Sequence, residues 1–330
     1  MNPRYLYAAL TLLLIVSLSA SIALGAVPVP LLAALRPGPD WDWVRRILWS
    51  VRLPRALCGC IVGAALSSSG LVLQSVFRNP LAEPSVLGVS GCAALAAQLA
   101  LFSGLGQLAS YSVPLAAVIG AAVGISLLLF LVRGLHHVPE PVLISGVALG
   151  QLALAVSALL LSLALRDYSI ARRLLTWLLG GLDGRTWLHV LWGVGPLVAA
   201  ILRIAARSRE IDALTLGDTT ALAVGVDVAR SRRELVLIAA VLSGIAVAIA
   251  GIVGFVGLII PYFVKRWLQP RRGSAVWACA LAGGSFVVLS DLVARLLIAP
   301  EELQIGAVSA LFGAPLFAWL LLRRYRELAT

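Results

Sequence analysis

Residues 112–133 read SVPLAAVIGAAVGISLLLFLVR, and no charged side chain occurs in this run before Arg133 at its end. An α-helix rises about 1.5 Å per residue, so ~20 apolar residues cross the ~30 Å hydrocarbon core of a bilayer. This pattern recurs and predicts an all-α, polytopic membrane protein with about ten transmembrane helices. Comparable runs occur near residues 7–27, 56–76, 86–103, 112–133, 141–165, 187–204, 235–250, 252–268, 275–298 and 305–322.

The composition of the whole chain agrees with a membrane protein. Of the 330 residues, 61% are hydrophobic and only 12% are charged, and the mean hydropathy is +0.99. A soluble domain has roughly 45–50% apolar and ~25% charged residues. A water-soluble fold with this composition could not keep its apolar side chains away from water. No long polar stretch occurs, so we expect residues 1–330 to form a single transmembrane domain.

The basic residues indicate how the chain is oriented in the membrane. The net charge is +11, with 26 Lys and Arg residues against 15 Asp and Glu residues. If both termini are cytoplasmic, most of the basic residues fall in cytoplasmic loops, as the positive-inside rule requires. The outer side still carries many arginines. They indicate an acidic partner or an anionic ligand on that side, or else anchoring to lipid headgroups.

The one substantial polar interruption is the segment 205–234. Asp218 or Thr219 can cap the start of a short helix there, and Gly225 can end it. We expect a pair of short amphipathic helices on the cytoplasmic surface, too small for an enzyme but suited to docking on another protein. A loop that lies on the lipid headgroups is the alternative interpretation.

Side chains that could carry chemistry are few at membrane depth. Asp291 lies in a hydrophobic run with Arg295 one helical turn later, and an ion pair between them would lower the cost of burying both charges. A proton or sodium relay would need more buried carboxylates, which leaves an ion-coupled secondary transporter as a remote alternative. The four cysteines and three histidines lack the spacing of a metal site, so we expect no metal in this chain.

A nucleotide-binding loop is absent from the sequence. The Walker A motif requires a lysine after its second glycine, and the sole lysine, Lys265, follows Val264. We therefore expect that the chain is not itself an enzyme and holds no cofactor. If ATP drives it, a partner subunit binds ATP and Mg²⁺ and acts on the segment 205–234.

Eight motifs occur in order along nearly the whole chain: VRLPR at 51–55, QSVFRNPLAEP at 74–84, LISGVAL at 143–149, LTLGD at 214–218, LAVGV at 222–226, GFVGLIIP at 254–261, ELQIGAV at 302–308 and FGAPLF at 312–317. Together they resemble the iron-siderophore, haem and vitamin B12 permeases of type II ABC importers. The resemblance implies the type II importer permease fold in a bacterial inner membrane. It also implies a homodimer, two ATPase subunits on the cytoplasmic side and a periplasmic substrate-binding protein.

The same resemblance gives roles to particular residues. It implies that Arg52, Arg55 and Arg295 receive acidic residues of the binding protein. The residues that it places in the coupling helices against the ATPase are Leu214, Leu216, Gly217, Asp218, Ala221, Gly225 and Val226. The loop that is specific to the family contains Arg78, Asn79, Pro80, Glu83 and Pro84.

The ligand pathway is less well defined by the sequence. We predict that Gln74, Arg172 and Arg173 lie along it, and anchoring at the membrane interface is an equally good interpretation of the two arginines. A ferric siderophore is the first expectation for the cargo, with haem or a corrinoid as the alternative. Where the family often has a histidine after the proline of its GFVGLIIP motif, this chain has Tyr262. A role for that histidine therefore does not transfer.

Overall fold

The structure is a computed structural model that describes residues 3–25, 41–107, 109, 111–132, 139–267 and 275–329. The described residues form the all-α fold that the hydrophobic runs predict. The α-helices are α1 (Pro3–Ala23), α2 (Trp41–Ile47), α3 (Leu53–Val76), α4 (Val89–Phe102), α5 (Ser112–Leu131), α6 (Pro139–Ala164), α7 (Tyr168–Leu179), α8 (Trp187–Ala206), α9 (Ser208–Leu216), α10 (Asp218–Ala223), α11 (Val228–Ala250), α12 (Val256–Trp267), α13 (Ala275–Leu296) and α14 (Ile305–Ala329). A π-helix, η2 (Leu48–Arg52), and two 3₁₀-helices, η3 (Pro84–Leu87) and η4 (Leu105–Gln107), complete the list.

Each of the ten predicted hydrophobic runs contains a helix, but the helices differ in length. Seven stretches of the described chain are long and apolar enough to cross a membrane, whereas α4, α12 and the apolar portion of α14 are shorter. α4 starts late because Gly88, in the left-handed conformation, separates it from η3. α12 starts only at Val256 because residues 252–255 are not helical. The ends of three predicted runs, at residues 26–27, 133 and 268, lie outside the described residues.

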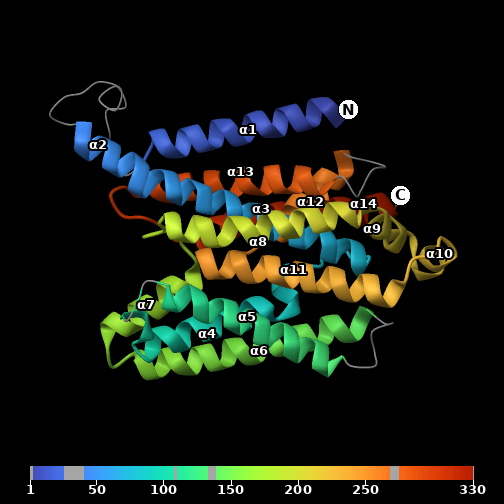
Figure 1. Cartoon of the computed structure of the whole chain (residues 1–330), viewed down its shortest axis with the longest axis horizontal. Coiled ribbons are helices and arrows are strands. Elements are labelled where there is room, and N and C mark those ends of the chain that lie inside the picture. The colour runs from blue at the N-terminus through green and yellow to red at the C-terminus, as the bar shows by residue number, and fades with distance from the viewer. Residues whose placement is uncertain are drawn as a thin grey trace.

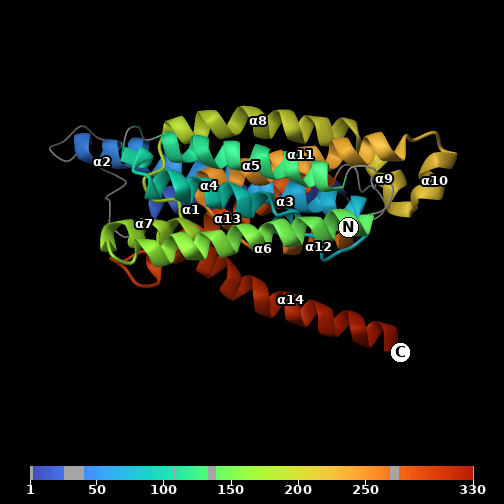
Figure 2. The ribbon, with the colours of Figure 1, turned by 90° about the horizontal axis from the view of Figure 1, so that it is seen from below.

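The helices run along a common direction and form an elongated bundle (Figure 1). α3 lies inside it, in contact with α8, α11, α12 and α13. α1 packs on α13 at one edge, and α4, α5 and α6 contact one another at the other edge. α14 diverges from the remaining helices, as the second view shows (Figure 2).

Glycines let α3 approach its neighbours closely. A Cβ atom at Gly63 would overlap the carbonyl oxygen of Gly283 on α13, and one at Gly70 would overlap the carbonyl oxygen of Gly257 on α12. Lipid offers no hydrophobic force that drives helices together, so membrane helices gain stability from such close van der Waals packing. These contacts fix α3 between two helices of the C-terminal third of the chain.

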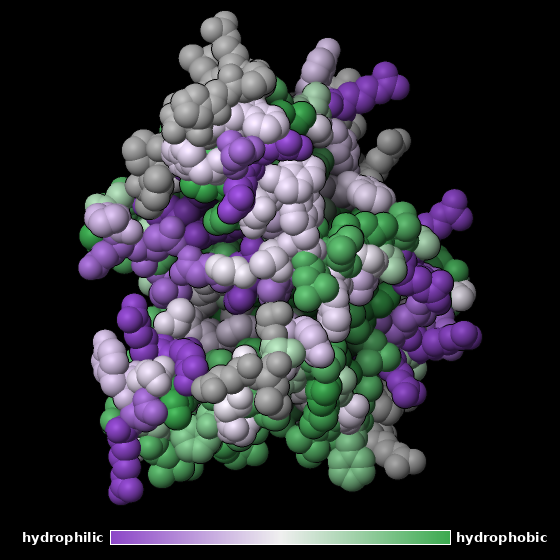
Figure 3. All heavy atoms as spheres, turned by 60° about the vertical axis from the view of Figure 1, so that its left-hand side comes forward, coloured by the Kyte–Doolittle hydropathy of each residue, from purple (hydrophilic) through white to green (hydrophobic). Residues whose placement is uncertain are grey.

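The first turn of α1 and the last turn of α14 lie at the end of the bundle that carries α9 and α10 (Figure 1). We call this the α10 end, and the opposite end, which carries α2 and α7, the α7 end. In the view that brings the α7 end forward, hydrophilic side chains gather around that end and hydrophobic ones cover much of the bundle's side (Figure 3). Large apolar side chains such as Val123, Phe130 and Ile144 remain exposed, as a lipid-facing surface requires.

α2, η2 and α3 form one continuous helical stretch of 36 residues, Trp41–Val76. The sequence predicts only its second part, 56–76, because four arginines between residues 45 and 55 break the hydrophobic run. The indole of Trp187, at the start of α8, holds the stretch at η2. Its Nε1 donates a hydrogen bond of 2.9 Å to the carbonyl oxygen of Trp49, and the two rings lie 5.1 Å apart.

Candidate functional site

The α7 end contains a buried group of charged side chains centred on Arg55 of α3. Nη2 of Arg55 lies 2.8 Å from Oδ1 of Asp291 on α13, and Nε completes a two-pronged contact with the same carboxylate. Nη1 contacts Asp183 at 2.9 Å and Glu302 at 2.8 Å. We call Arg55, Asp291, Arg295, Asp183 and Glu302 the Arg55 cluster. It joins α3, α13 and the two loops that follow α7 and α13.

Arg295 and Arg52 extend this group to the last turn of α1. The predicted ion pair within α13 is confirmed, since Nε of Arg295 lies 3.0 Å from Oδ2 of Asp291. Nη2 of Arg295 also donates to Oγ of Ser21 at 2.6 Å. Arg52 donates to the carbonyl oxygens of Ile22 and Ala23, both at 2.8 Å. These carbonyls have no partner within α1, and a guanidinium at a helix C-terminus satisfies them.

The burial of these arginines bears on the role that the resemblance gives them. Arg52, Arg55 and Arg295 are only 5%, 8% and 3% exposed, and all three bind groups of this chain. Contact with an acidic partner residue therefore remains a prediction. Two of the partners of Arg55 are partly exposed, because the side chains of Asp183 and Glu302 are 56% and 26% exposed.

The two loop carboxylates of the Arg55 cluster titrate in opposite directions. Burial raises the pKa of Glu302 above the ordinary 4.5, and a hydrogen bond with Asp183 raises it further, against the effect of Arg55. The pKa of Asp183 is lowered, because the hydrogen bond with Glu302 and the charges of Arg55 and Arg185 outweigh its burial. The pair therefore holds a proton on Glu302 more readily than on Asp183.

At the α10 end, the segment 205–234 forms the predicted pair of short helices, α9 and α10. Gly225 ends α10 as expected, with φ of 80°. Its N–H donates to Leu222 O while the N–H of Val226 donates to Ala221 O, which is the Schellman arrangement. The expected side-chain cap is wrong, since α10 begins at Asp218 after an uncapped Gly217. The Asp218 carboxylate instead binds Arg232 at 2.8 Å, so it cannot fold back on the helix.

The predicted coupling residues divide into anchors and exposed side chains. Leu214 and Ala221 are buried and hold α9 and α10 against the bundle. Leu216 points into solvent with 70% exposure, together with Leu222 at 62% and Val224 at 66%. We call these last three side chains the apolar patch; they lie at the end of α9 and on or just after α10, which projects from the bundle in Figure 1.

A second group of ion pairs supports α9 from the neighbouring helices. Arg207, between α8 and α9, contacts Glu210 and lies 2.6 Å from Glu234 on α11. Glu234 also binds Arg203 of α8. We call Arg203, Arg207, Glu210 and Glu234 the Arg207 cluster. The side chains of Arg207 and Glu234 are 22% and 23% exposed, whereas those of Arg55 and Asp291 are 9% and 1% exposed.

The loop at 78–84 lies close to the start of α10 and to the start of α12. Arg78 adopts φ of 50°, and its Nη1 lies 3.5 Å from where a Cβ atom of Gly217 would be. Asn79 accepts a hydrogen bond from the N–H of Leu81 at 2.9 Å, next to Pro80 in the turn. The loop therefore brings the Arg78 side chain next to the start of α10.

The second half of this loop fixes the turn before α12. Glu83 Oε1 accepts a hydrogen bond of 2.7 Å from the N–H of Phe255, whose φ is 68°. Pro84 packs where a Cβ atom of Gly257 would lie. A non-glycine residue at positive φ costs energy, so the surrounding contacts must hold Phe255 in this conformation.

Gln74 is 3% exposed and bonds to the backbone of α12. Its Nε2 donates to the carbonyl oxygens of Gly257 and Leu258, at 3.2 and 3.1 Å. Pro261 has no N–H for the Gly257 carbonyl, so Gln74 supplies the donor that the helix lacks. Lys265 Nζ lies 3.3 Å from Gln74 Oε1. A place for Gln74 on the ligand pathway remains a prediction.

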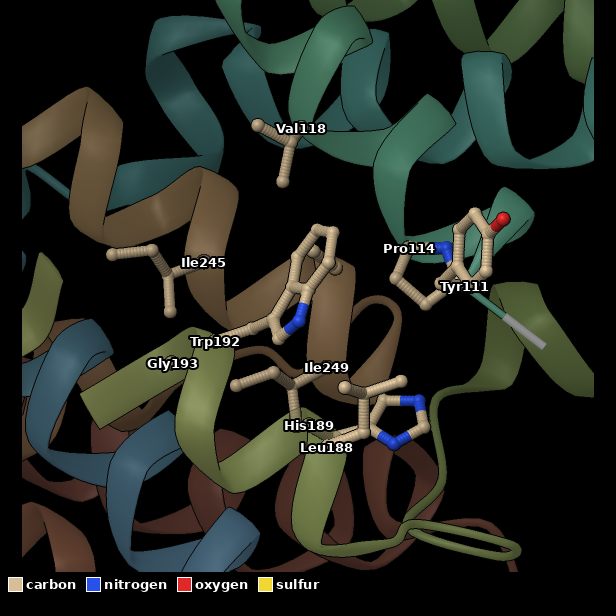
Figure 4. Close-up of a pocket in the computed structure, with 10 residues that line it drawn as sticks. Tyr111, Pro114, Val118, Leu188, His189, Trp192, Gly193, Ile245 and Ile249 are labelled. Carbon is tan, nitrogen blue, oxygen red and sulfur yellow. The ribbon is translucent and has the colours of Figure 1, made fainter. Parts of the chain in front are cut away.

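Two cavities lie near the α7 end. A small apolar one of about 50 Å³ lies between α5, α8 and α11. In the close-up, the Trp192 indole stands between Val118 and Ile249, with His189 and Tyr111 to one side (Figure 4). The other cavity, of about 350 Å³, is lined by Arg172 and Arg173 of α7. These two predicted pathway residues therefore lie together on a cavity wall.

Comparison with known proteins identifies the family to which this chain belongs. The model of the FecCD transport family matches residues 12–323. The chain belongs to the FecCD transport family. It is 39% identical over 305 residues to the vitamin B12 import system permease protein BtuC of Shigella sonnei, covering 90% of this chain and 92% of the relative. BtuC of Escherichia coli O157:H7 is 38% identical with the same coverage.

A solved structure agrees with the family assignment. It is described as an inward-facing conformation of a metal-chelate type ABC transporter, and its TM-score with this chain is 0.86 at 30% identity. The match covers 98% of this chain and 100% of the other. The resemblance of the motifs to permeases of this family is therefore confirmed, as is the permease fold.

Some polar residues of this FecCD member are functional candidates that the sequence did not single out. Asp183 and Glu302 lie in loops far from Arg55 in the sequence, so no local spacing links them. Glu302 is the first residue of the ELQIGAV motif, and this was the one feature of the sequence that could have singled it out. Trp177, on α7, and Arg185, in the loop after it, line the larger cavity. Only the three-dimensional fold reveals this shared location.

Proposed function

We propose that this chain is the permease subunit of an ATP-driven importer for a corrinoid such as vitamin B12. The identity of 38–39% to vitamin B12 permeases over 90% of the chain supports this cargo over the siderophore that the motifs alone favour. A ferric chelate is the second candidate, because the similar solved structure is described as a metal-chelate type transporter.

Uptake by the native host tests the cargo. Cells that lack the gene should lose uptake of labelled cyanocobalamin and regain it when the gene is restored, while uptake of a ferric siderophore stays unchanged. Loss of siderophore uptake alone would reject the corrinoid and favour the second candidate. Uptake that persists when the partner ATPase is deleted would reject an ATP-driven importer altogether.

The proposed orientation places both termini and the α10 end in the cytoplasm of a bacterium and the α7 end outside its inner membrane. The chain itself hydrolyses no ATP in this proposal, and ATP and Mg²⁺ are bound by two partner subunits. The apolar patch of Leu216, Leu222 and Val224 would seat on an ATPase subunit, since solvent-exposed apolar side chains at the tip of a projecting helix pair are suited to a partner groove.

Replacing Leu216 and Leu222 by Asp should abolish co-purification of the ATPase and ATP-dependent uptake. The matched control is Leu105→Asp, which changes a leucine that is 48% exposed at the opposite end. Normal assembly of the Leu216 and Leu222 variant would contradict the coupling role. Equal loss in the control would show that the charge itself, and not its position, is harmful.

A second copy of the chain would complete the pathway. α14 diverges from its own bundle and leaves Leu311 and Phe312 exposed at 66% and 51%. We propose that this face packs against the partner copy, with Gln74 and the cavity beside α7 along the route of the cargo. Native mass spectrometry of the purified protein should give a dimer, and Phe312→Asp should shift it to a monomer.

The binding protein would dock at the α7 end. A carboxylate of that protein could replace Asp183 or Glu302 on the half-exposed side of Arg55, whereas the Asp291 carboxylate that pairs with Arg295 is only 1% exposed. Arg55→Gln should therefore weaken binding of the binding protein in nanodiscs more than Arg295→Gln, although both remove a buried charge. Equal effects of the two variants would mean that these arginines act only through the fold.

A further inference from the structure

The larger cavity at the α7 end has an unusual polar wall. Its volume is about 350 Å³, and its polar lining includes Arg172, Arg173 and Thr176 from α7 together with Trp177, Arg185 and Gln304. The size is suited to one end of a cofactor-sized molecule, since ligand pockets usually measure ~300–1,000 Å³. The cavity therefore offers room for a chemical group larger than a water molecule.

The charges around this cavity are mainly positive. Three guanidinium groups line it against one carboxylate, Asp183, and that carboxylate is held by Arg55 at 2.9 Å. Arg172 and Arg173 are exposed and form no salt bridge in the described part of the chain. They are available to an anion, and guanidinium groups match the geometry of phosphate and carboxylate oxygens.

Arg185 is fixed where it contributes to the same wall. Its Nε donates to the carbonyl oxygen of Ile249, and its guanidinium lies 5.5 Å from the centre of the Trp177 ring. The ring and the cation stabilise each other's position. The cavity thus has one rigid positive charge and two that can adapt.

Two residues that line the cavity each have a buried polar atom with no hydrogen-bond partner among the described residues. These atoms are Nε1 of Trp177, whose side chain is largely buried, with 9% of the residue exposed, and Oε1 of Gln304. A buried donor or acceptor without a partner costs about 1–3 kcal/mol. An arriving molecule that accepts a hydrogen bond from Trp177 and donates one to Gln304 would remove this cost.

We propose that the cavity is a subsite for an anionic group of the cargo, either a phosphodiester or a carboxylate with an N–H or O–H donor beside it. This assignment rests on the proposed function. A cobalamin carries both elements, because its nucleotide loop contains one phosphodiester and its corrin ring bears primary amides. Arg172 and Arg173 bind the anion, Trp177 donates to it, and Gln304 accepts from the neighbouring donor.

Cyanocobalamin and dicyanocobinamide separate this subsite from the rest of the pathway, since cobinamide keeps the corrin ring and its amides but lacks the phosphodiester. In host cells with Arg172→Gln and Arg173→Gln together, uptake of cyanocobalamin below saturation should fall about tenfold or more, the loss expected for removing charge-assisted bonds. Cobinamide uptake should remain near the original rate. Trp177→Phe should lower cobalamin uptake in the same selective way.

Arg166→Gln is the matched control, because Arg166 is exposed at the same end but does not line the cavity. Equal losses for cobalamin and cobinamide, or an effect of Arg166→Gln as large as that of the double variant, would overturn the subsite while leaving corrinoid transport intact. If the original chain carries neither corrinoid, the proposed function fails, and the subsite is decided by a measurement without cargo.

That measurement uses Thr176→Cys, which places a thiol on the exposed part of the cavity wall. In phosphatidylcholine nanodiscs, millimolar inorganic phosphate should slow maleimide labelling of this thiol relative to chloride at equal ionic strength. The protection should disappear with Arg172→Gln and Arg173→Gln. Equal rates in phosphate and chloride overturn the anion site. Protection by phosphatidylglycerol nanodiscs without phosphate identifies a lipid headgroup as the occupant and overturns the assignment to cargo.

Discussion

The Arg55 cluster and the Arg207 cluster use the same chemistry at opposite ends of the bundle, but they differ in burial. The side chains of Arg55 and Asp291 are 9% and 1% exposed, whereas those of Arg207 and Glu234 are 22% and 23% exposed. A buried charge that loses its partner is left without solvation, while an exposed one is taken up by water. The comparison teaches that the Arg55 cluster holds the fold together, whereas the Arg207 cluster can rearrange at low cost.

This difference agrees with the proposed roles of the two ends. A coupling segment must shift against its neighbours, and weak, solvent-screened ion pairs permit this. The α7 end instead keeps α3 and α13 in register through buried ion pairs, and part-buried hydrogen bonds from Arg52 attach α1.

Removing the central carboxylate should produce the largest effect. Asp291→Asn leaves Arg55 and Arg295 facing each other with one negative charge fewer, so the free energy of unfolding should fall by about 3–5 kcal/mol. Denaturant titration in mixed micelles measures this change. Glu301→Gln, at an exposed position, is the control. A loss below about 1 kcal/mol would mean that the Arg55 cluster behaves like a surface ion pair.

The contact between α3 and α13 can also be broken without touching a charge. Gly63→Ala should destabilise by about 1–3 kcal/mol, because its methyl group would overlap the carbonyl oxygen of Gly283. Gly195→Ala on α8 has no atom within 4 Å apart from its chain neighbours, so it should cost less than Gly63→Ala, with only the restriction from the following Pro196 against it. The same titration tests both variants. If Gly63→Ala matched Gly195→Ala, the close approach of the two helices would be wrong.

The Arg207 cluster should give a smaller response. Glu234→Gln removes the carboxylate that joins Arg203 and Arg207, and the cost should be below about 1 kcal/mol because all three side chains are partly solvated. The remaining contribution should shrink further at high salt. An effect equal to that of Asp291→Asn would erase the difference between the two clusters.

Glu302 should produce the smallest effect, as a dependence on pH. Its pKa in the folded protein is raised by burial, so the stabilisation is present below the ordinary 4.5 and is lost as the pH rises through the raised value. As the pH rises from 4.5 through the raised pKa of Glu302, the melting temperature of the original chain should therefore fall slightly. The melting temperature of Glu302→Gln should fall less. Asp183→Asn identifies the opposite contribution, which is lost on acidification below the ordinary 3.8. Parallel curves for the original chain and Glu302→Gln would contradict the shift.

Local patterns predicted the helices and one ion pair. Hydrophobic runs gave a helix in each of ten places, and the spacing of Asp291 and Arg295 gave their contact within α13. The contact of Arg55 with Asp291 joins residues that are 236 positions apart, so only the packing of α3 on α13 reveals it. The amphipathic helix α7 interrupts no hydrophobic run and was not expected, and with it the cavity that α7 lines.

The 36-residue stretch Trp41–Val76 is about 54 Å long at 1.5 Å per residue, and a bilayer core measures ~30 Å. About 24 Å is left over, which exceeds the ~10–15 Å that the two headgroup layers add together. The hydrogen bond from Trp187 fixes this helical stretch at Trp49, only a few residues before Arg52 and Arg55. A force on Trp41 is therefore transmitted along the helix axis to the interior of the bundle, because no loop interrupts the stretch between Trp41 and Val76.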